Sequence, residues 1–295
     1  MRKSGFSIRR TPLAVFKHAL IACLGIVFVF PIWWMVVNSF KSQPEIYAQL
    51  DSFRTFLPPA DMSGMFDSYV NLVRAFDLFF LAILNSFLYA AILICFVLLV
   101  NSFAGYALSR FRFPGSKVFV TIIILILIVP VETSVVPLYT ILFRMGLLNT
   151  SGVLRENIRI IAYILPGIAS PFYIFMFRQF FLGIPKELEE AAKIDGASRL
   201  RTYFSVIVPN AKGVFAAVTV FTFMGVWNDY LWPQLIFTNQ RQFPLQVFLQ
   251  IVNNYNPPDI SMVMASLTIS TIPIAIVYVL AQKYIVDGVA FTGLK

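Results

Sequence analysis

The chain has 295 residues, of which 59% are hydrophobic and 13% charged, with a net charge of +9 and a mean hydropathy of +0.79. This composition lies far outside the range of soluble globular domains and indicates an integral membrane protein. A net positive charge can also mark a nucleic-acid-binding protein. Here, however, Lys and Arg flank long apolar runs, where they set the orientation of the chain in a bilayer. We therefore exclude nucleic acid as a partner and expect the lipid bilayer to be the main solvent.

Six stretches are apolar and long enough to cross a hydrocarbon core about 30 Å thick, which takes roughly 20 residues of helix. They cover residues 17–39, 78–108, 117–142, 158–182, 212–237 and 261–283. A basic segment precedes the first stretch, as in a secretory signal, but no small-residue cleavage site follows it, so we expect a retained membrane anchor. The predicted fold class is all-α integral membrane, with six transmembrane helices in a single domain over residues 1–295.

Lys and Arg are distributed unevenly between the two sides of these spans. With the N-terminus inside, 16 of the 23 basic residues fall on the inner side. Cytoplasmic segments carry the excess of Lys and Arg in membrane proteins, so both termini are expected in the cytoplasm. The loop at residues 183–210, between the fourth and fifth spans, then also lies in the cytoplasm. The longest polar segment, residues 41–77, lies on the outer side and is expected to be a loop with short helices.

Residue types that perform catalysis or bind metals are scarce. The only histidine, His18, stands at the start of the first apolar run, and Cys23 and Cys95 lie within apolar runs. These residues assemble neither a metal site nor a nucleophilic centre. The sequence also lacks a G-x-x-x-x-G-K-[ST] phosphate-binding loop. We expect no cofactor, no metal and no enzymatic activity in this chain, so any ATP has to be hydrolysed by a separate polypeptide.

The segment KELEEAAKIDGASRL, which begins at residue 186, is a highly charged strip between two apolar spans. A proline before it suits a first helical turn, three glutamates favour the positive end of the helix dipole, and Asp195 with Gly196 supplies a terminating turn. The pattern predicts a short cytoplasmic helix in which Ala191 and Ala192 allow close approach. Physical reasoning alone leaves two alternatives, a helix that fits a partner's groove and an interfacial helix on lipid head groups.

The spacing within this strip resembles the EAA signature of the permease subunits of binding-protein-dependent ABC importers. The matching residues are Glu190, Ala191, Ala192, Gly196, Val206, Val208 and Pro209. Valines stand where the signature favours isoleucine and leucine. The stretches NSFAGYALSRFRFPG, VPVETSVVPLYTILFRMGLLNT and WNDYLWPQLIFT are similar to carbohydrate-uptake permeases of the maltose-permease type. The C-terminal YIVDGVAFTGLK departs from the usual family ending at Asp287.

The resemblance implies that the strip is a coupling helix, between spans four and five, that docks on a cytoplasmic ATPase. The coupling residues it implies are Glu190, Ala191, Ala192, Asp195, Gly196 and Pro209. It also implies a second homologous permease subunit, two ATPase subunits that hold ATP and Mg²⁺, and an extracytoplasmic binding protein that delivers a sugar or oligosaccharide, all at the bacterial cytoplasmic (inner) membrane. An ABC permease for amino acids or peptides, and a secondary transporter, remain as alternatives.

Polar side chains inside or beside the apolar spans mark candidate positions in a substrate pathway, because charge within a membrane is costly. The candidates are Glu132, Trp227, Asn228, Asp229 and Tyr230. Aromatic faces and planar polar groups suit a saccharide, but an aromatic belt at the membrane interface explains the same cluster. For Glu132, snorkelling to the interface or pairing with Arg144 is an alternative. At the inner end of the second span, Tyr106 and Arg110 are expected to have an orienting role.

Overall fold

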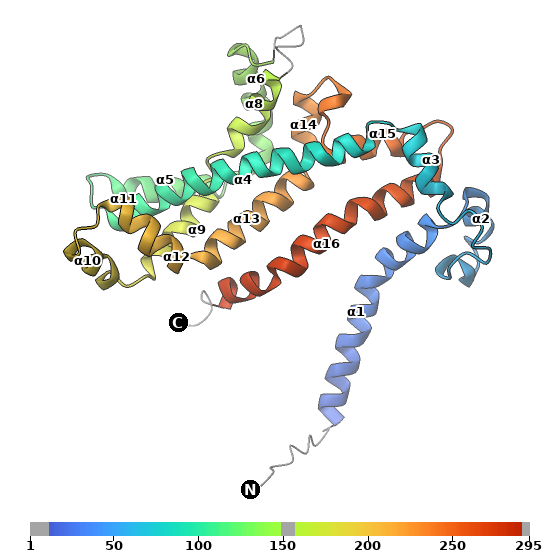
Figure 1. Ribbon diagram of the computed structural model, residues 1–295, viewed down its shortest axis with the longest axis horizontal. Helices are drawn as coiled ribbons and strands as arrows, with labels where there is room; N and C mark the ends of the chain where they lie inside the picture. The colour runs from blue at the N-terminus through green and yellow to red at the C-terminus, as the bar shows by residue number, and fades with distance from the viewer. Residues whose placement is uncertain (1–11, 149–156, 291–295) are drawn as a thin grey trace. The chain divides into compact units, whose positions relative to one another are not determined.

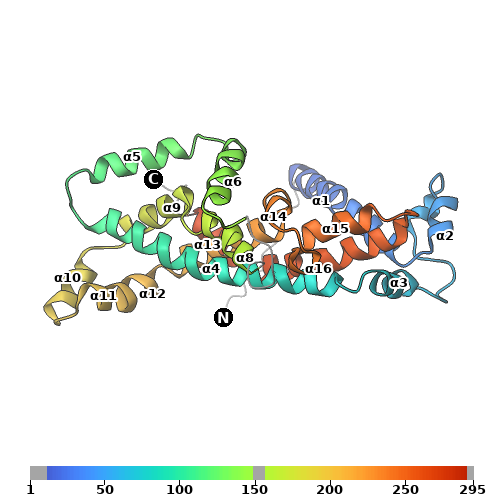
Figure 2. The same cartoon turned by 90° about the horizontal axis from the view of Figure 1, so that it is seen from above.

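The computed structural model describes residues 12–148 and 157–290, and all regular structure in those ranges is helical. The predicted all-α fold class is confirmed. The chain divides into two compact units, one of Met1–Asp77 with Ile251–Ile269 and the other of Leu78–Gln250 with Ser270–Lys295. Figure 1 shows the helices with their labels, and Figure 2 shows them from above.

Three helices among the described residues are each long and apolar enough to cross a membrane. They are Val15–Ser39 within α1 (Pro12–Ser39), α4 (Phe79–Arg110) and Ile260–Gln282 within α16 (Ile260–Ala290). These helices correspond to the first, second and sixth predicted spans. Pro31 and Pro273 lie inside α1 and α16, and neither ends its helix.

The other three predicted spans are not single straight helices. Each falls on a pair of helices that is bent at a short break: Ser116–Ile126 with Val131–Arg144 by 99°, Ile158–Gly167 with Pro171–Leu182 by 46°, and Arg199–Asn210 with Lys212–Trp227 by 79°. If each pair is one span, the described residues hold six. Pro130, Pro171 and Pro209 stand at these breaks, where a missing N–H and a ring clash prevent the helix from continuing. Figure 2 shows the turn between α5 (Ser116–Ile126) and α6 (Val135–Arg144) clearly.

The predicted fifth span, residues 212–237, is interrupted near its outer end. Helix α13 (Lys212–Trp227) stops at Trp227, and α14 (Leu231–Ile236) follows after a turn. The side-chain amide of Asn228 donates to the Met224 carbonyl at 2.8 Å, and the Asn228 backbone N–H donates to the same carbonyl at 3.1 Å. The aromatic and polar cluster therefore lies at a helix end and in a turn instead of inside a span.

Within the second unit, α4 lies side by side with α9 (Pro171–Leu182) and α13 (Figures 1 and 2). Gly105 permits this approach, because a Cβ at that position would stand 2.6 Å from the Phe177 Cβ. Around this crossing the buried core is aromatic and aliphatic, with Val97, Phe177, Phe181, Ile207 and Val214 among its members. The remaining elements of this unit include η2 (Val131–Ser134), α8 (Ile158–Ile164), η3 (Leu165–Gly167) and η5 (Gln240–Gln242).

Within the first unit, short helices follow the end of α1, as predicted for residues 41–77. They are α2 (Gln43–Ala48), η1 (Phe53–Phe56) and α3 (Asp67–Ala75). Helix α15 (Leu245–Asn253) begins in the second unit and ends in the first. Lys41 is only 1% exposed, and its ammonium group donates to Gln49 Oε1 and to the Arg54 carbonyl, both at 2.9 Å. This buried lysine ties the end of α1 to the segment that precedes η1.

Candidate functional site

The charged strip forms the short helix that its sequence predicts. Helix α10 spans Glu187–Ile194, with glutamates in its first turn and Lys193 in its last. It ends in a Schellman motif, in which the Gly196 N–H bonds the Lys193 carbonyl at 3.0 Å and the Ala197 N–H bonds the Ala192 carbonyl at 2.9 Å. Gly196 has φ +78°, a left-handed conformation that glycine adopts without a Cβ penalty. The predicted need for glycine at this turn is confirmed.

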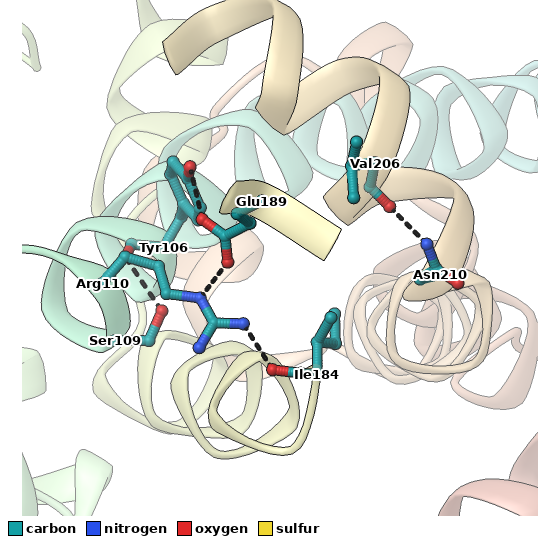
Figure 3. Close-up of polar contacts among 7 residues, drawn as sticks. All are labelled: Tyr106, Ser109, Arg110, Ile184, Glu189, Val206 and Asn210. Carbon is teal, nitrogen blue, oxygen red and sulfur yellow. Dashed lines mark hydrogen bonds and ion pairs between the residues drawn. The ribbon is translucent and has the colours of Figure 1, made fainter. Parts of the chain in front are cut away.

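The chain continues into a second helical segment that leads back toward the bundle. This segment comprises α11 (Arg199–Thr202), the π-helical turn η4 (Tyr203–Ile207) and α12 (Val208–Asn210). Pro209 has no N–H to donate to the preceding turn, which favours the wider π spacing there. The Asn210 amide donates instead to the Val206 carbonyl at 2.7 Å (Figure 3). Pro209 thus stands beside the 79° bend, away from α10 itself.

Two side chains from the end of α4 hold α10 in place (Figure 3). Arg110 forms an ion pair with Glu189, and its guanidinium also donates to the Ile184 carbonyl at 2.8 Å. The Tyr106 hydroxyl donates to the other carboxylate oxygen of Glu189 at 3.3 Å. The Arg110 and Glu189 side chains are 5% and 18% exposed, so water screens the pair only weakly. We call these three residues, Tyr106, Arg110 and Glu189, the α4–α10 clasp.

The segment after α10 is anchored in the core of the same unit. The Tyr203 hydroxyl lies 2.6 Å from the Ser102 hydroxyl, and its ring stacks on Phe103 with centroids 4.6 Å apart. Tyr203 and Ile207 are both buried. The clasp and this anchor attach both flanks of α10 to α4.

The outer surface of α10 carries apolar side chains that nothing in the described structure covers. Ile194 is 87% exposed and Leu188 is also exposed, on a helix that carries three glutamates and one lysine. Glu190, Ala191, Asp195 and Gly196 are exposed, and Ala192 is half-buried. Five of the six predicted coupling residues therefore share one short exposed element, and Pro209 lies apart at the bend. Exposed apolar residues rimmed by charge are typical of a protein-docking surface.

A cavity of about 420 Å³ lies between α10, α11 and the end of α4. Charged side chains of both signs line it, including Lys186, Glu190, Lys193 and Arg199. The Arg199 guanidinium also stacks 4.9 Å over the Phe111 ring. The cavity gives α10 a polar recess beside its exposed apolar side chains.

The predicted substrate-pathway residues occupy different environments. Trp227 is fully buried, stacked on Phe223 at 5.3 Å, and its indole N–H donates to the Ser270 carbonyl. Asp229 is half-buried and accepts hydrogen bonds from the Tyr163 hydroxyl and from the Trp232 N–H at 3.4 Å. Tyr163 could not be predicted as a partner of Asp229, because it lies on α8, more than sixty residues away in the sequence.

The remaining pathway candidates are exposed. Asn228 and Tyr230 lie in the turn after α13, and Glu132 lies in η2 without an ion pair to Arg144 among the described residues. The pathway roles of these residues remain predictions. In the described part of the chain, His, Cys, Asp and Glu nowhere form a group of three or more that would hold a metal ion.

Three long apolar helices and three bent helix pairs, with the clasped charged helix α10 between the fourth and fifth of them, define a polytopic membrane protein. Residues 19–290 match the family described as "Binding-protein-dependent transport system inner membrane component", and the chain belongs to this family. The match confirms the resemblance to importer permeases and the prediction of a non-catalytic membrane subunit.

Curated relatives extend over nearly the whole chain. The chain is 30% identical to the lactose transport system permease protein LacG of Rhizobium radiobacter, covering 96% of this chain and 97% of that protein. It is 31% identical to the diacetylchitobiose uptake system permease protein NgcG of Streptomyces coelicolor, covering 98% and 91%. It is 27% identical to the arabinooligosaccharides transport system permease protein AraQ of Bacillus subtilis, covering 98% and 97%.

A solved structure has the same fold. It is a crystal structure of a bacterial ABC transporter involved in the import of the acidic polysaccharide alginate, with a TM-score of 0.78 and 26% identity. The alignment covers 95% of this chain and 99% of that one.

Proposed function

We propose that this chain is the permease subunit of an ATP-driven importer that translocates a sugar or oligosaccharide. The observation that carries the proposal is α10, a short helix clasped to α4 by Arg110 and Glu189 with Ile194 exposed on its outer surface. The sugar class is supported by the named substrates of LacG, NgcG and AraQ.

The proposed complex contains a second homologous permease subunit, two ATPase subunits that bind ATP and Mg²⁺, and an extracytoplasmic binding protein. Both termini and α10 lie in the cytoplasm, and the membrane is the bacterial inner membrane. Glu190, Ala191, Ala192, Asp195 and Gly196 form the contact with one ATPase, while Pro209 sets the bend after it.

The mechanism is mechanical, and this chain forms or breaks no covalent bond. When ATP binding closes the ATPase pair, α10 moves with the subunit on which it is docked. The α4–α10 clasp transmits this displacement to α4, and buried Tyr203 and Ile207 transmit it to the core around α9 and α13. The spans then alternate between inward-open and outward-open arrangements.

The test is reconstitution of the chain in liposomes with its co-expressed permease, ATPase and binding-protein partners. We expect ATP-dependent uptake of a saccharide and stimulation of ATP hydrolysis by the loaded binding protein. Transport by the purified chain alone, driven by an ion gradient, would contradict the proposal. Uptake of an amino acid or peptide in place of any sugar would contradict the substrate class only.

A further inference from the structure

A second cavity, of about 470 Å³, lies in the first unit, within the volume range of small-ligand sites. Its lining residues come from the start of α2, from α3 and from the segment that begins α16. They are Ser42, Gln43, Pro44, Tyr47, Asp67, Ser68, Asn71, Asp259 and Ser261. The coupling machinery uses none of them.

Hydrogen bonds connect the chain segments that surround this cavity. The Gln43 amide donates to the Pro258 carbonyl at 3.0 Å, and the Ser68 hydroxyl donates to the Lys41 carbonyl at 3.2 Å. The Ser261 N–H and hydroxyl donate to the same oxygen of Asp259, at 2.9 and 2.6 Å. The three chain segments are therefore held in fixed positions, so a ligand would meet a preorganised surface.

Four lining side chains are not used in this internal network. Ser42, Tyr47, Asp67 and Asn71 make no side-chain hydrogen bond or ion pair within the described residues. Together they offer two hydroxyls, one amide and one carboxylate, a mixture of donors and acceptors that matches ligand hydroxyls. Tyr47 is 52% exposed and adds an aromatic ring on which the C–H face of a sugar can stack.

The charge of the lining selects among ligand classes. Two carboxylates and no lysine or arginine line the cavity, so it repels an anion such as a uronate or a phosphate ester. Asp259 accepts three hydrogen bonds on one of its carboxylate oxygens, and the two carboxylates of the lining fall short of the group of three or more ligand residues that would hold a metal ion in the described part of the chain. Most lining residues carry a hydroxyl, amide or carboxylate group, while apolar atoms supply most of the exposed lining surface, and this combination suits a ligand that has both hydroxyls and a C–H face.

We propose that this cavity is a low-affinity subsite for a neutral saccharide on the outer side of the membrane. The inference rests on the proposed function and on the predicted orientation. It makes the proposed function more specific, because it selects a neutral substrate over an acidic one. Sugar released by the binding protein would be retained there through Asp67, Asn71 and Tyr47 before it enters the spans.

The test uses the assembled transporter in lipid nanodiscs, without the binding protein, and saturation-transfer NMR with lactose, arabinotriose and an alginate disaccharide. We expect lactose or arabinotriose to bind in the millimolar range and the acidic disaccharide to give no signal. Asp67→Ala and Asn71→Ala should each weaken binding at least tenfold. The matched control is Asp51→Ala, an exposed aspartate on the same segment outside the cavity.

Saccharide binding that is unchanged in both cavity variants would overturn the inference, as would equal binding of the acidic disaccharide. Variants that weaken attachment of the binding protein but leave saccharide binding intact would also overturn it, in favour of a protein contact. In each case ATP-dependent sugar uptake by the complete system would leave the proposed function standing. Melting temperatures of the variants within one or two degrees of wild type, roughly, would exclude misfolding as the cause.

Discussion

Arg110, the last residue of a membrane-spanning helix, is ion-paired with Glu189 in the first turn of α10. The two residues stand 79 positions apart in the sequence, and the pair joins the end of α4 to the first turn of α10. Tyr106 adds a hydrogen bond to the same carboxylate. The pair is thus placed to make α4 and α10 move as one body.

Replacing Arg110 by methionine should uncouple ATP hydrolysis from transport. Removing one partner of a buried pair costs roughly 3–5 kcal/mol, and somewhat less is expected here because Glu189 is partly exposed. We expect the complex to assemble and hydrolyse ATP, with sugar uptake per ATP lowered at least fivefold. Uptake and phosphate release measured in the same proteoliposomes give this ratio.

The matched control for the clasp is Glu187→Gln, which changes a neighbouring, exposed glutamate of the same helix. It should leave the ratio of uptake to hydrolysis unchanged. The charge-exchanged double variant Arg110→Glu with Glu189→Arg should recover part of the loss. If Glu187→Gln and Arg110→Met had equal effects, the clasp would have no special role.

Gly105 is expected to tolerate no side chain. The Cβ of Gly105→Ala would lie 2.6 Å from the Phe177 Cβ and 3.0 Å from the Arg178 backbone nitrogen, so α4 and α9 must separate. Overpacking of this kind costs about 1–3 kcal/mol and should lower the melting temperature of the detergent-solubilised chain. Gly213→Ala, where a Cβ would meet nothing within 4 Å, should melt like the wild type. Equal melting of the two variants would show that the crossing is looser than described.

Gly196 variants should affect ATPase association in a graded way. Gly196→Ala places a Cβ at φ +78° and costs about 1–2 kcal/mol, so partial loss is expected. Gly196→Pro cannot adopt this φ and also loses the N–H that bonds the Lys193 carbonyl, so the protein should insert normally but fail to retain its ATPase. Co-purification quantifies both effects. Full retention by Gly196→Pro would argue against docking through α10.

Lys41 should make stability depend on pH in the alkaline range. Burial lowers the pKa of its ammonium group, while Glu45 acts more weakly in the opposite direction. Between the lowered folded pKa and the unfolded value of 10.5, the unfolded chain binds more protons, so this group's contribution to stability rises with pH. The melting temperature of the wild type minus that of Lys41→Met should therefore increase as the pH rises. A decrease of this quantity would contradict the burial effect.

The sequence predicted those features whose causes are local. Three apolar runs without internal breaks became the helices Val15–Ser39, α4 and Ile260–Gln282. The charged strip became α10, with glycine at the left-handed position that its Asp195–Gly196 turn requires. In each case composition and turn chemistry over fewer than about thirty residues determine the element.

Features that depend on contacts between distant segments could not be predicted from the sequence. Proline marked the interrupted spans, but a proline can kink a helix or break it, and only packing decides, as Pro31 and Pro209 illustrate. Glu189 lies within the charged strip, yet its partner Arg110 is on another helix, and so is Tyr163, the partner of Asp229. The α4–α10 clasp therefore emerges only from the structure.

The central claim is that the exposed surface of α10 docks on a cytoplasmic ATPase, and site-specific cross-linking tests it most directly. In a chain with Cys23→Ser and Cys95→Ser, Ala191→Cys is labelled with a photoactivatable maleimide and irradiated in membranes that contain the complete complex. We predict an adduct with the ATPase from Ala191→Cys and none from the control Asp51→Cys on the other unit. An Ala191→Cys variant that transports sugar normally but labels only lipid would contradict the account.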